Sequence, residues 1–215
     1  RWRRLLWQRQ HRLWALIYGG GALGDASLTA EGLDLAVACG RRAHAADNSD
    51  LISGMAGLIR VLVGAAALTG SSEALSVACQ LGDVVVRRRV ASLHGIGWPS
   101  TIESTAPLTG AAHGVAGIAS ALLQLGAATG ERRFTSIARE AIAYERKRFD
   151  PAMGVWPDVR VDASVGPDAA SRQSWCYGPP GVALARLVNQ EAACSSDLEE
   201  ARDLPGRILR APVQR

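Results

Sequence analysis

The sequence predicts an all-α fold assembled from repeated helical hairpins. Three observations support this prediction: a short glycine motif that recurs along the chain, apolar residues at helical spacing after each copy, and an amphipathic segment behind a Thr-Gly pair. Self-similarity of this kind is typical of a repeated supersecondary unit. With 215 residues, of which 48% are hydrophobic, the chain is long enough to bury a single core.

The recurring motif reads x-x-G-x-x-G and is followed by an apolar residue. Its copies are Ile52–Leu58, Ala112–Ile118 and Cys176–Val182. In the first two copies the likeness continues to a Thr-Gly pair at the same distance from the motif, at positions 69–70 and 129–130. This regular spacing indicates that the copies share one structural plan.

Each motif opens a predicted inner helix. Apolar residues follow at helical spacing, namely Met55, Leu58 and Leu62 in the first copy and Val115, Ile118, Leu122 and Leu125 in the second. Behind the Thr-Gly pair, the mixed polar and apolar segments Glu73–Val86 and Arg132–Arg146 predict outward-facing amphipathic helices. In the third copy, Pro179 or Pro180 is expected to open a helix that runs through Leu187, because proline suits the first helical position.

The apolar stretch Leu51–Leu68 raises the question of a membrane span. Arg60 near its middle would cost about 2.5–3.5 kcal/mol on insertion scales, and the second copy carries Gln124, so we predict buried helices and no span. The basic start Arg1-Trp2-Arg3-Arg4 is not followed by an apolar region that ends in a small-residue cleavage site. We therefore expect a cytoplasmic protein.

The charge and the cysteines exclude further classes. The net charge is +4 with basic clusters at 87–89 and 146–148, but no nucleic-acid motif accompanies them, so solvated helix faces are expected and no nucleic-acid partner. The four cysteines lie far apart without a C-x-x-C pair, which argues against a disulfide framework and against a zinc finger. The oligomeric state is left open by the sequence.

Two residues of the motif copies carry chemistry. Cys176 precedes the third helix start, whose positive end favours a thiolate, a nucleophile or metal ligand; the alternative is a small buried hydrophobic residue. His113 occupies the same position before the first glycine as Ser53 and Tyr177. Three helix starts are therefore predicted to converge on one place, although a core histidine without a role would also fit this position.

Further motifs give the chain a family resemblance. The runs Pro107–Ile118, Tyr144–Arg146, Trp156–Asp158 and Trp175–Gly178 resemble the lanthionine synthetase C-like cyclases, most closely the C-terminal cyclase domain of bifunctional lanthipeptide synthetases. The resemblance extends from about residue 13 to residue 187. It implies an α/α toroid of inner and outer helices, which agrees with the repeats.

The resemblance also implies an activity. In this family, zinc held by two cysteines and one histidine takes up a cysteine thiolate of a dehydrated precursor peptide, which adds to dehydroalanine or dehydrobutyrine and closes a thioether ring. A thiol bound to zinc is deprotonated at neutral pH. By this resemblance Cys176 matches the first zinc cysteine and His113 the acid/base histidine, while Asp50, Arg172 and Tyr177 match the acidic and polar residues nearby.

The chain departs from the family pattern after Cys176. Family members continue to a helix start that reads Cys-His-Gly and supplies the second and third zinc ligands, whereas here Cys194 follows and no histidine comes after His113. We therefore expect residues 1–215 to form a single partial cyclase domain, a fragment with an incomplete toroid and an incomplete zinc site. Asp50 and Arg172 also have simpler interpretations, as a helix cap and as the partner of a carboxylate.

Two classes of function follow from the sequence. The first is a cyclase that acts on a dehydrated precursor peptide. The second is a non-catalytic α/α toroid that binds a peptide or a protein, with Cys176 unmetallated. A helical-toroid glycosidase is a weaker alternative, because it requires a pair of carboxylates across a cleft and Asp50 and Asp158 are poor candidates.

Overall fold

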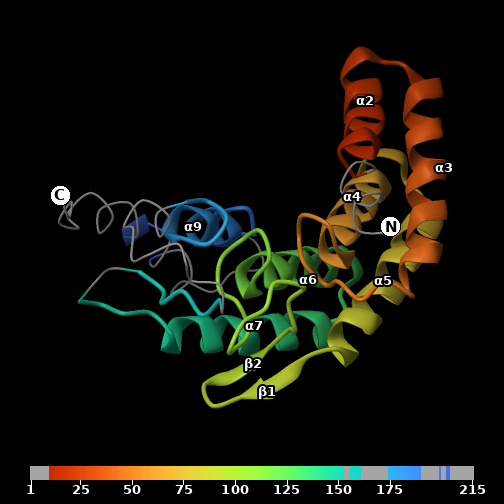
Figure 1. Ribbon diagram of the computed structural model, residues 1–215. Helices are drawn as coiled ribbons and strands as arrows, with labels where there is room; N and C mark the ends of the chain where they lie inside the picture. Colours follow the sequence, from red (N-terminus) through yellow and green to blue (C-terminus); the bar gives the residue numbers. More distant parts are fainter. Residues whose placement is uncertain (1–9, 153–154, 161–173, 190–198, 200–201, 204–215) are drawn as a thin grey trace.

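The computed structural model describes residues 10–152, 155–160, 174–189, 199 and 202–203, and Figure 1 shows their arrangement. Apart from one small hairpin of strands, the regular elements of these residues are helices, which confirms the predicted all-α class. In chain order the elements are η1 (Ala15–Gly19), α2 (Gly20–Leu23), α3 (Ala26–Ala43), α4 (Met55–Thr69), α5 (Ser72–Arg87), β1 (Val90–Ser92), β2 (Gly95–Gly97), α6 (Val115–Thr129), α7 (Arg132–Lys147) and α9 (Pro179–Leu187).

The repeated unit is a helical hairpin, as the sequence predicts. α4 packs on α5 and α6 on α7, and α6 also contacts α4 on one side and α9 on the other. Figure 1 shows α4, α6 and α9 along the inner side of an arc, α5 and α7 along its outer side, and α2 with α3 at one end. The arc is open over the described residues, and its closure into an α/α toroid stays a prediction.

The two layers differ in burial. α6 is buried along most of its length and α4 over most of its turns, whereas α5 and α7 bury one face only. Leu62 and Leu122, at matching positions of the two inner helices, are both inaccessible to solvent, and so is Phe134 on α7. The hydrophobic core therefore lies between the inner and outer layers.

The inner helices end in the same way in both complete hairpins. The hydroxyls of Thr69 and Thr129 each donate to the carbonyl four residues earlier, at 2.7 Å. The next residues, Gly70 and Gly130, have φ angles of 74° and 73°, a left-handed conformation that favours glycine. In each hairpin the outer helix begins after one further residue.

One element was not predicted. β1 and β2 form an antiparallel hairpin between the two helical hairpins. Trp98, which follows β2, donates its indole N–H to the Val85 carbonyl at 2.7 Å and so anchors this segment on α5. Three-residue strands carry no usable alternation of apolar residues, and the sequence gives little signal for them.

Near the start of the described residues the chain is helical from residue 10 onward, and it winds as the π-helix η1 over Ala15–Gly19. α9 begins at Pro179, as predicted. Among the described residues, no helix combines the length and apolarity that crossing a bilayer requires.

Candidate functional site

The helix starts share one local structure. The backbone is extended at the first glycine of every motif, with φ angles of −121°, −116° and −105° at Gly54, Gly114 and Gly178. In the first copy the Met55 N–H donates to the Asn48 carbonyl at 3.0 Å, and in the second the Val115 N–H donates to the Leu108 carbonyl at 2.9 Å. The motif is therefore a repeated junction between a loop and a helix.

The second glycine of each motif is required by close packing. A Cβ atom at this position would overlap a backbone carbonyl oxygen six residues earlier. The overlapping pairs are Gly57 with Leu51, Gly117 with Ala111, and Gly181 with Trp175. A backbone carbonyl cannot move aside as a flexible side chain can, so glycine lets the loop fold back against its own helix.

Backbone hydrogen bonds bring the three junctions together. The Leu51 N–H donates to the Ala112 carbonyl at 3.1 Å, and the Ala112 N–H donates to the Cys176 carbonyl at 3.0 Å. The rings of His113 and Tyr177 lie with their centroids 6.0 Å apart. The structure thus places the predicted site residues of all three motif copies side by side.

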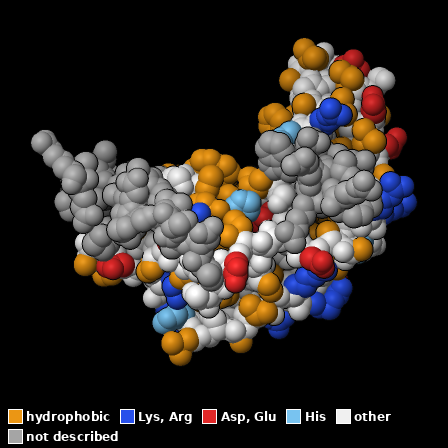
Figure 2. Space-filling view, in the orientation of Figure 1, with side chains coloured by type: hydrophobic (Ala, Val, Ile, Leu, Met, Phe, Trp, Pro, Cys, Tyr) orange, Lys and Arg blue, Asp and Glu red, His pale blue; other side chains and the backbone are white. Residues whose placement is uncertain are grey.

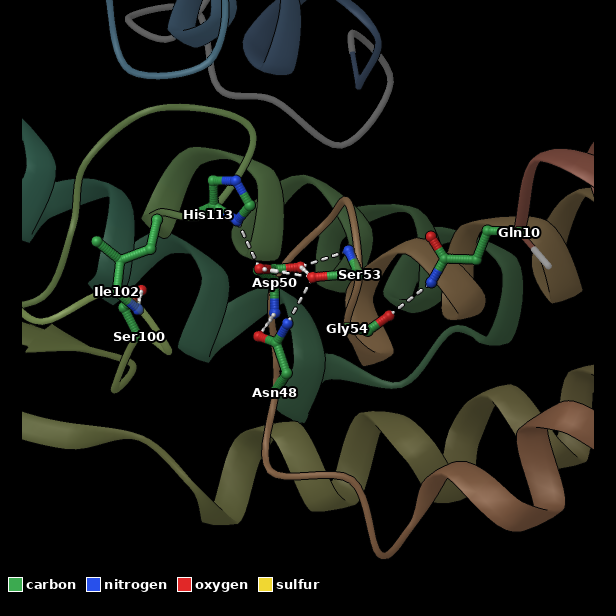
Figure 3. Close-up of polar contacts among 8 residues, drawn as sticks. All are labelled: Gln10, Asn48, Asp50, Ser53, Gly54, Ser100, Ile102 and His113. Carbon is green, nitrogen blue, oxygen red and sulfur yellow. Dashed lines mark hydrogen bonds and ion pairs between the residues drawn. The ribbon is translucent and has the colours of Figure 1, made fainter. Parts of the chain in front are cut away.

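Asp50 and His113 form the central polar contact of this site. Figure 3 shows the Asp50 carboxylate between His113, Ser53 and Asn48. His113 Nδ1 lies 2.6 Å from Asp50 Oδ2, the Ser53 backbone N–H donates to Asp50 at 2.7 Å, and Asn48 Nδ2 donates to the Ser53 hydroxyl at 2.8 Å. The Asp50 side chain is only 4% exposed, against 24% for His113. A buried carboxylate therefore orients a partly accessible imidazole.

The surroundings of Asp50 keep it ionised. Burial by itself would raise the pKa of Asp50, but hydrogen bonds from His113, Ser53 and Asn48, together with the charge of His113, outweigh it and hold the pKa below the ordinary value. Because a carboxylate only accepts hydrogen bonds, it favours a proton on Nδ1 of His113. Nε2 is then the ring atom that can exchange a proton with a ligand. Asp50 also accepts the backbone N–H three residues later, as a capping side chain does, although α4 itself begins at Met55 with Gly54 as its N-cap.

The third junction carries Cys176 and Tyr177 in the turn before α9. Burial raises the pKa of Tyr177 against the opposing effect of Arg160, so its phenol is protonated near neutral pH. The Arg160 guanidinium lies over the Tyr177 ring, 4.4 Å from its centroid, and donates from Nε to Asp158 at 2.9 Å. Arg172, which the family pattern predicts nearby, lies outside the described residues.

A buried ion pair that was not predicted from the sequence supports this site. Glu145 of α7 accepts from the Gly110 N–H at 3.0 Å and pairs with Arg186 of α9 at 2.7 Å. These two charged side chains are at most 1% exposed. The alignment of the two hairpins gives one sequence signal for Glu145, because this charged residue stands where the first hairpin has the apolar, buried Val85. Arg160 was also missed, and no motif marks it.

The site lies at the edge of a hollow surface. Figure 2 shows the molecule hollowed between the arm that carries α2 and α3 and the arm that carries α9, with hydrophobic side chains gathered on the concave face. A cavity of about 880 Å³ follows α4, α6 and the end of α9. Its lining includes Leu51 and Ile52, which directly follow Asp50.

Comparison with known families gives a match over most of the chain. Residues 14–203 match the family described as lanthionine synthetase C-like protein. The chain belongs to this family. A comparison with curated proteins found no match.

The lanthionine synthetase C-like family is generally associated with zinc, and the described donors do not fit this metal. A zinc site needs at least three protein ligands. In the part of the chain that the structure describes, no three His, Cys, Asp or Glu side chains are grouped so that they could hold a metal ion. Cys194 lies outside that part. Cys176 alone does not form a zinc site.

Proposed function

We propose that residues 1–215 act as a cyclase domain in the biosynthesis of lanthipeptides. The substrate is a dehydrated precursor peptide in the cytoplasm, and the reaction joins a cysteine thiol to dehydroalanine or dehydrobutyrine as a thioether. One observation supports this proposal best: in a chain of the lanthionine synthetase C-like family, His113 is held 2.6 Å from a buried, ionised Asp50 where three helix starts meet.

In the proposed reaction His113 moves one proton. Its Nε2 takes the proton of the substrate thiol, the sulfur forms a bond to Cβ of the dehydro residue, and the π electrons of the double bond move to the neighbouring carbonyl oxygen as an enolate. The imidazolium then returns the proton to Cα, so that the product has the same atoms as the substrate. Asp50 holds the ring and stabilises the imidazolium between the two transfers.

Two other predicted residues take supporting roles in this proposal. The protonated phenol of Tyr177, beside the His113 ring, is suited to donate a hydrogen bond to the enolate oxygen. Cys176 is proposed as a zinc ligand on the family resemblance alone, with Arg172 as a polar neighbour, and no step of the proposed reaction passes through the metal.

A cyclisation assay tests the proposal. The substrate is a synthetic peptide with one cysteine and one dehydroalanine, and ring closure is measured by mass spectrometry as the loss of thiol alkylation by N-ethylmaleimide. We expect the wild-type chain to accelerate closure over the rate without protein. His113→Asn is expected to lower the rate by about 100-fold or more, as for a general acid–base residue. His94→Asn, between β1 and β2, is the matched control with an unchanged rate.

The outcomes separate the alternatives. Parallel assays with added Zn²⁺ and with a chelator measure the dependence on metal separately from the dependence on His113. Equal rates for the wild type and His113→Asn would contradict the role of His113. If the wild type binds the peptide but does not accelerate closure in either condition, the chain is a peptide-binding protein instead.

A further inference from the structure

The cavity beside the site has the size and the charge of a binding site for an anion. Its volume of about 880 Å³ lies within the range of ligand-binding clefts, about 300–1,000 Å³. Its described lining includes Arg60 and His11 but no aspartate or glutamate. Over its described lining the cavity therefore presents positive charge without an acidic side chain.

Arg60 is held in place at the wall of this cavity. It lies in the middle of α4, and its Nε donates to Oε1 of Gln124 on α6 at 3.1 Å. This contact joins two inner helices. It uses Nε of the guanidinium, so it does not compete with a bidentate contact that a ligand makes through the two terminal nitrogens. Gln124 is neutral, so it fixes the direction of the guanidinium and leaves its charge uncompensated.

The surroundings of Arg60 make its charge costly without a ligand. Burial lowers the pKa of Arg60, and the described group that opposes this effect is Tyr18, a phenol rather than a carboxylate. An arginine stays charged at neutral pH, and a partly buried charge is stabilised by an anionic partner. Apolar side chains that include Val61 and Leu187 line the cavity around it. The matching ligand combines a carboxylate with apolar neighbours.

The cavity also adjoins the candidate active site. Leu51 and Ile52 line it, and they are the two residues that follow Asp50 in the first junction. A peptide whose reacting residue lies at His113 can therefore continue along α4 towards Arg60. One end of this path is His113 in the loop before α6, and the other is Arg60 on α4.

We propose that this cavity binds a carboxylate-bearing segment of a peptide, with Arg60 as the anion contact and Gln124 as its positioning residue. For the identity of the peptide the inference rests on the proposed function: the acidic residue then belongs to the precursor peptide, close in sequence to the residues that form the thioether. The binding itself requires no cyclisation, so the two proposals are tested separately.

The test is a titration of the isotope-labelled chain followed by NMR. The probes are acetyl-Leu-Glu-Leu-amide and its glutamine counterpart, which differ in the carboxylate. We expect the glutamate probe to shift backbone amides near Arg60 and Gln124 and to bind about tenfold more tightly than the glutamine probe, as for a charge-assisted contact. In Arg60→Gln this preference is lost. Arg41→Gln removes an exposed arginine that pairs with Glu73, so it controls for net charge and keeps the preference.

Several results would overturn the proposal. Equal binding of the two probes to the wild type, no binding of either, or shifts confined to other surfaces would each do so. If Arg60→Gln does not fold, the comparison of probes on the wild type and its weakening by salt decide the matter. A wild-type chain that binds the glutamate probe but does not cyclise peptides would contradict the proposed function and leave this inference standing.

Discussion

The two complete hairpins, α4–α5 and α6–α7, have nearly the same backbone but different buried residues. In each hairpin a tryptophan beyond the outer helix donates its indole N–H to a carbonyl of that helix at 2.7 Å: Trp98 to Val85, and Trp156 to Glu145. Val85 and Glu145 stand 60 positions apart, and both are inaccessible to solvent. The same place in the repeat therefore holds an apolar side chain in one hairpin and a charged one in the other.

This difference shows how a repeated scaffold is adapted to a site. In the first junction the Asp50 N–H donates to the side chain of Asn48 at 3.1 Å, two residues away. In the second junction the matching N–H, that of Gly110, donates to Glu145 of the outer helix, and Glu145 pairs with Arg186 of α9. At this position the first junction is held by its own loop, whereas the second is held by the outer helix and, through Arg186, by α9. Backbone hydrogen bonds bring all three loops together, and the buried ion pair adds a side-chain link between the second hairpin and α9.

Breaking the ion pair is expected to have the largest effect. Glu145→Gln leaves Arg186 buried without this carboxylate, which should lower the free energy of unfolding by about 3–5 kcal/mol. Replacing both residues by methionine removes both charges and should restore much of the loss, since buried pairs often give way to apolar groups at little cost. Denaturant unfolding measures both variants. A single variant as stable as the wild type would contradict the coupling.

Glycine substitutions test whether the two junctions are equivalent. Gly57→Ala and Gly117→Ala each place a Cβ against a backbone carbonyl and should each cost about 1–3 kcal/mol of unfolding free energy. Gly19→Ala is the control, because a Cβ there has no atom within 4 Å. Thermal or denaturant unfolding gives the comparison. Clearly unequal losses at residues 57 and 117 would show that the likeness of the two loops does not extend to their energetics.

The hairpins could be predicted because their signals are local. Glycine spacing, apolar residues at helical period and the Thr-Gly ends all lie within one unit of the chain, and α9 starts at Pro179, one of the two prolines predicted to open it. The β1–β2 hairpin could not, because strands of three residues show no period. Whether the arc closes as a toroid depends on contacts that no single repeat encodes.

The site was predictable to the extent that the repeat defines it. His113 and Tyr177 occupy one position of the motif, and the prediction that their helix starts meet is confirmed by the bonds between the loops. The repeat marks Glu145 by its alignment with Val85, but its partner Arg186 lies 41 positions away on another helix, so only the packed structure reveals the pair. The catalytic and zinc roles given to Asp50, His113, Tyr177, Arg172 and Cys176 stay predictions.

The smallest expected effect is a pH dependence that belongs to the first junction. The folded-state pKa of Asp50 lies below the ordinary value of 3.8, so Asp50 contributes stability that is present above that pH and is lost as the pH falls through the folded-state pKa. The difference in unfolding free energy between the wild type and Asp50→Asn should therefore shrink in acid. Asp47→Asn, whose side chain is 90% exposed, should show no such change.

The second hairpin makes this experiment specific. It has Gly110 where the first hairpin has Asp50, so the matching loop position holds no group that titrates. The acid-sensitive part of the difference between the wild type and Asp50→Asn therefore reports on the carboxylate that orients His113, rather than on the loop structure that both hairpins share. A difference that stays constant from neutral to acidic pH would mean that Asp50 acts only through packing, and the local stabilisation of the first junction would then need another source.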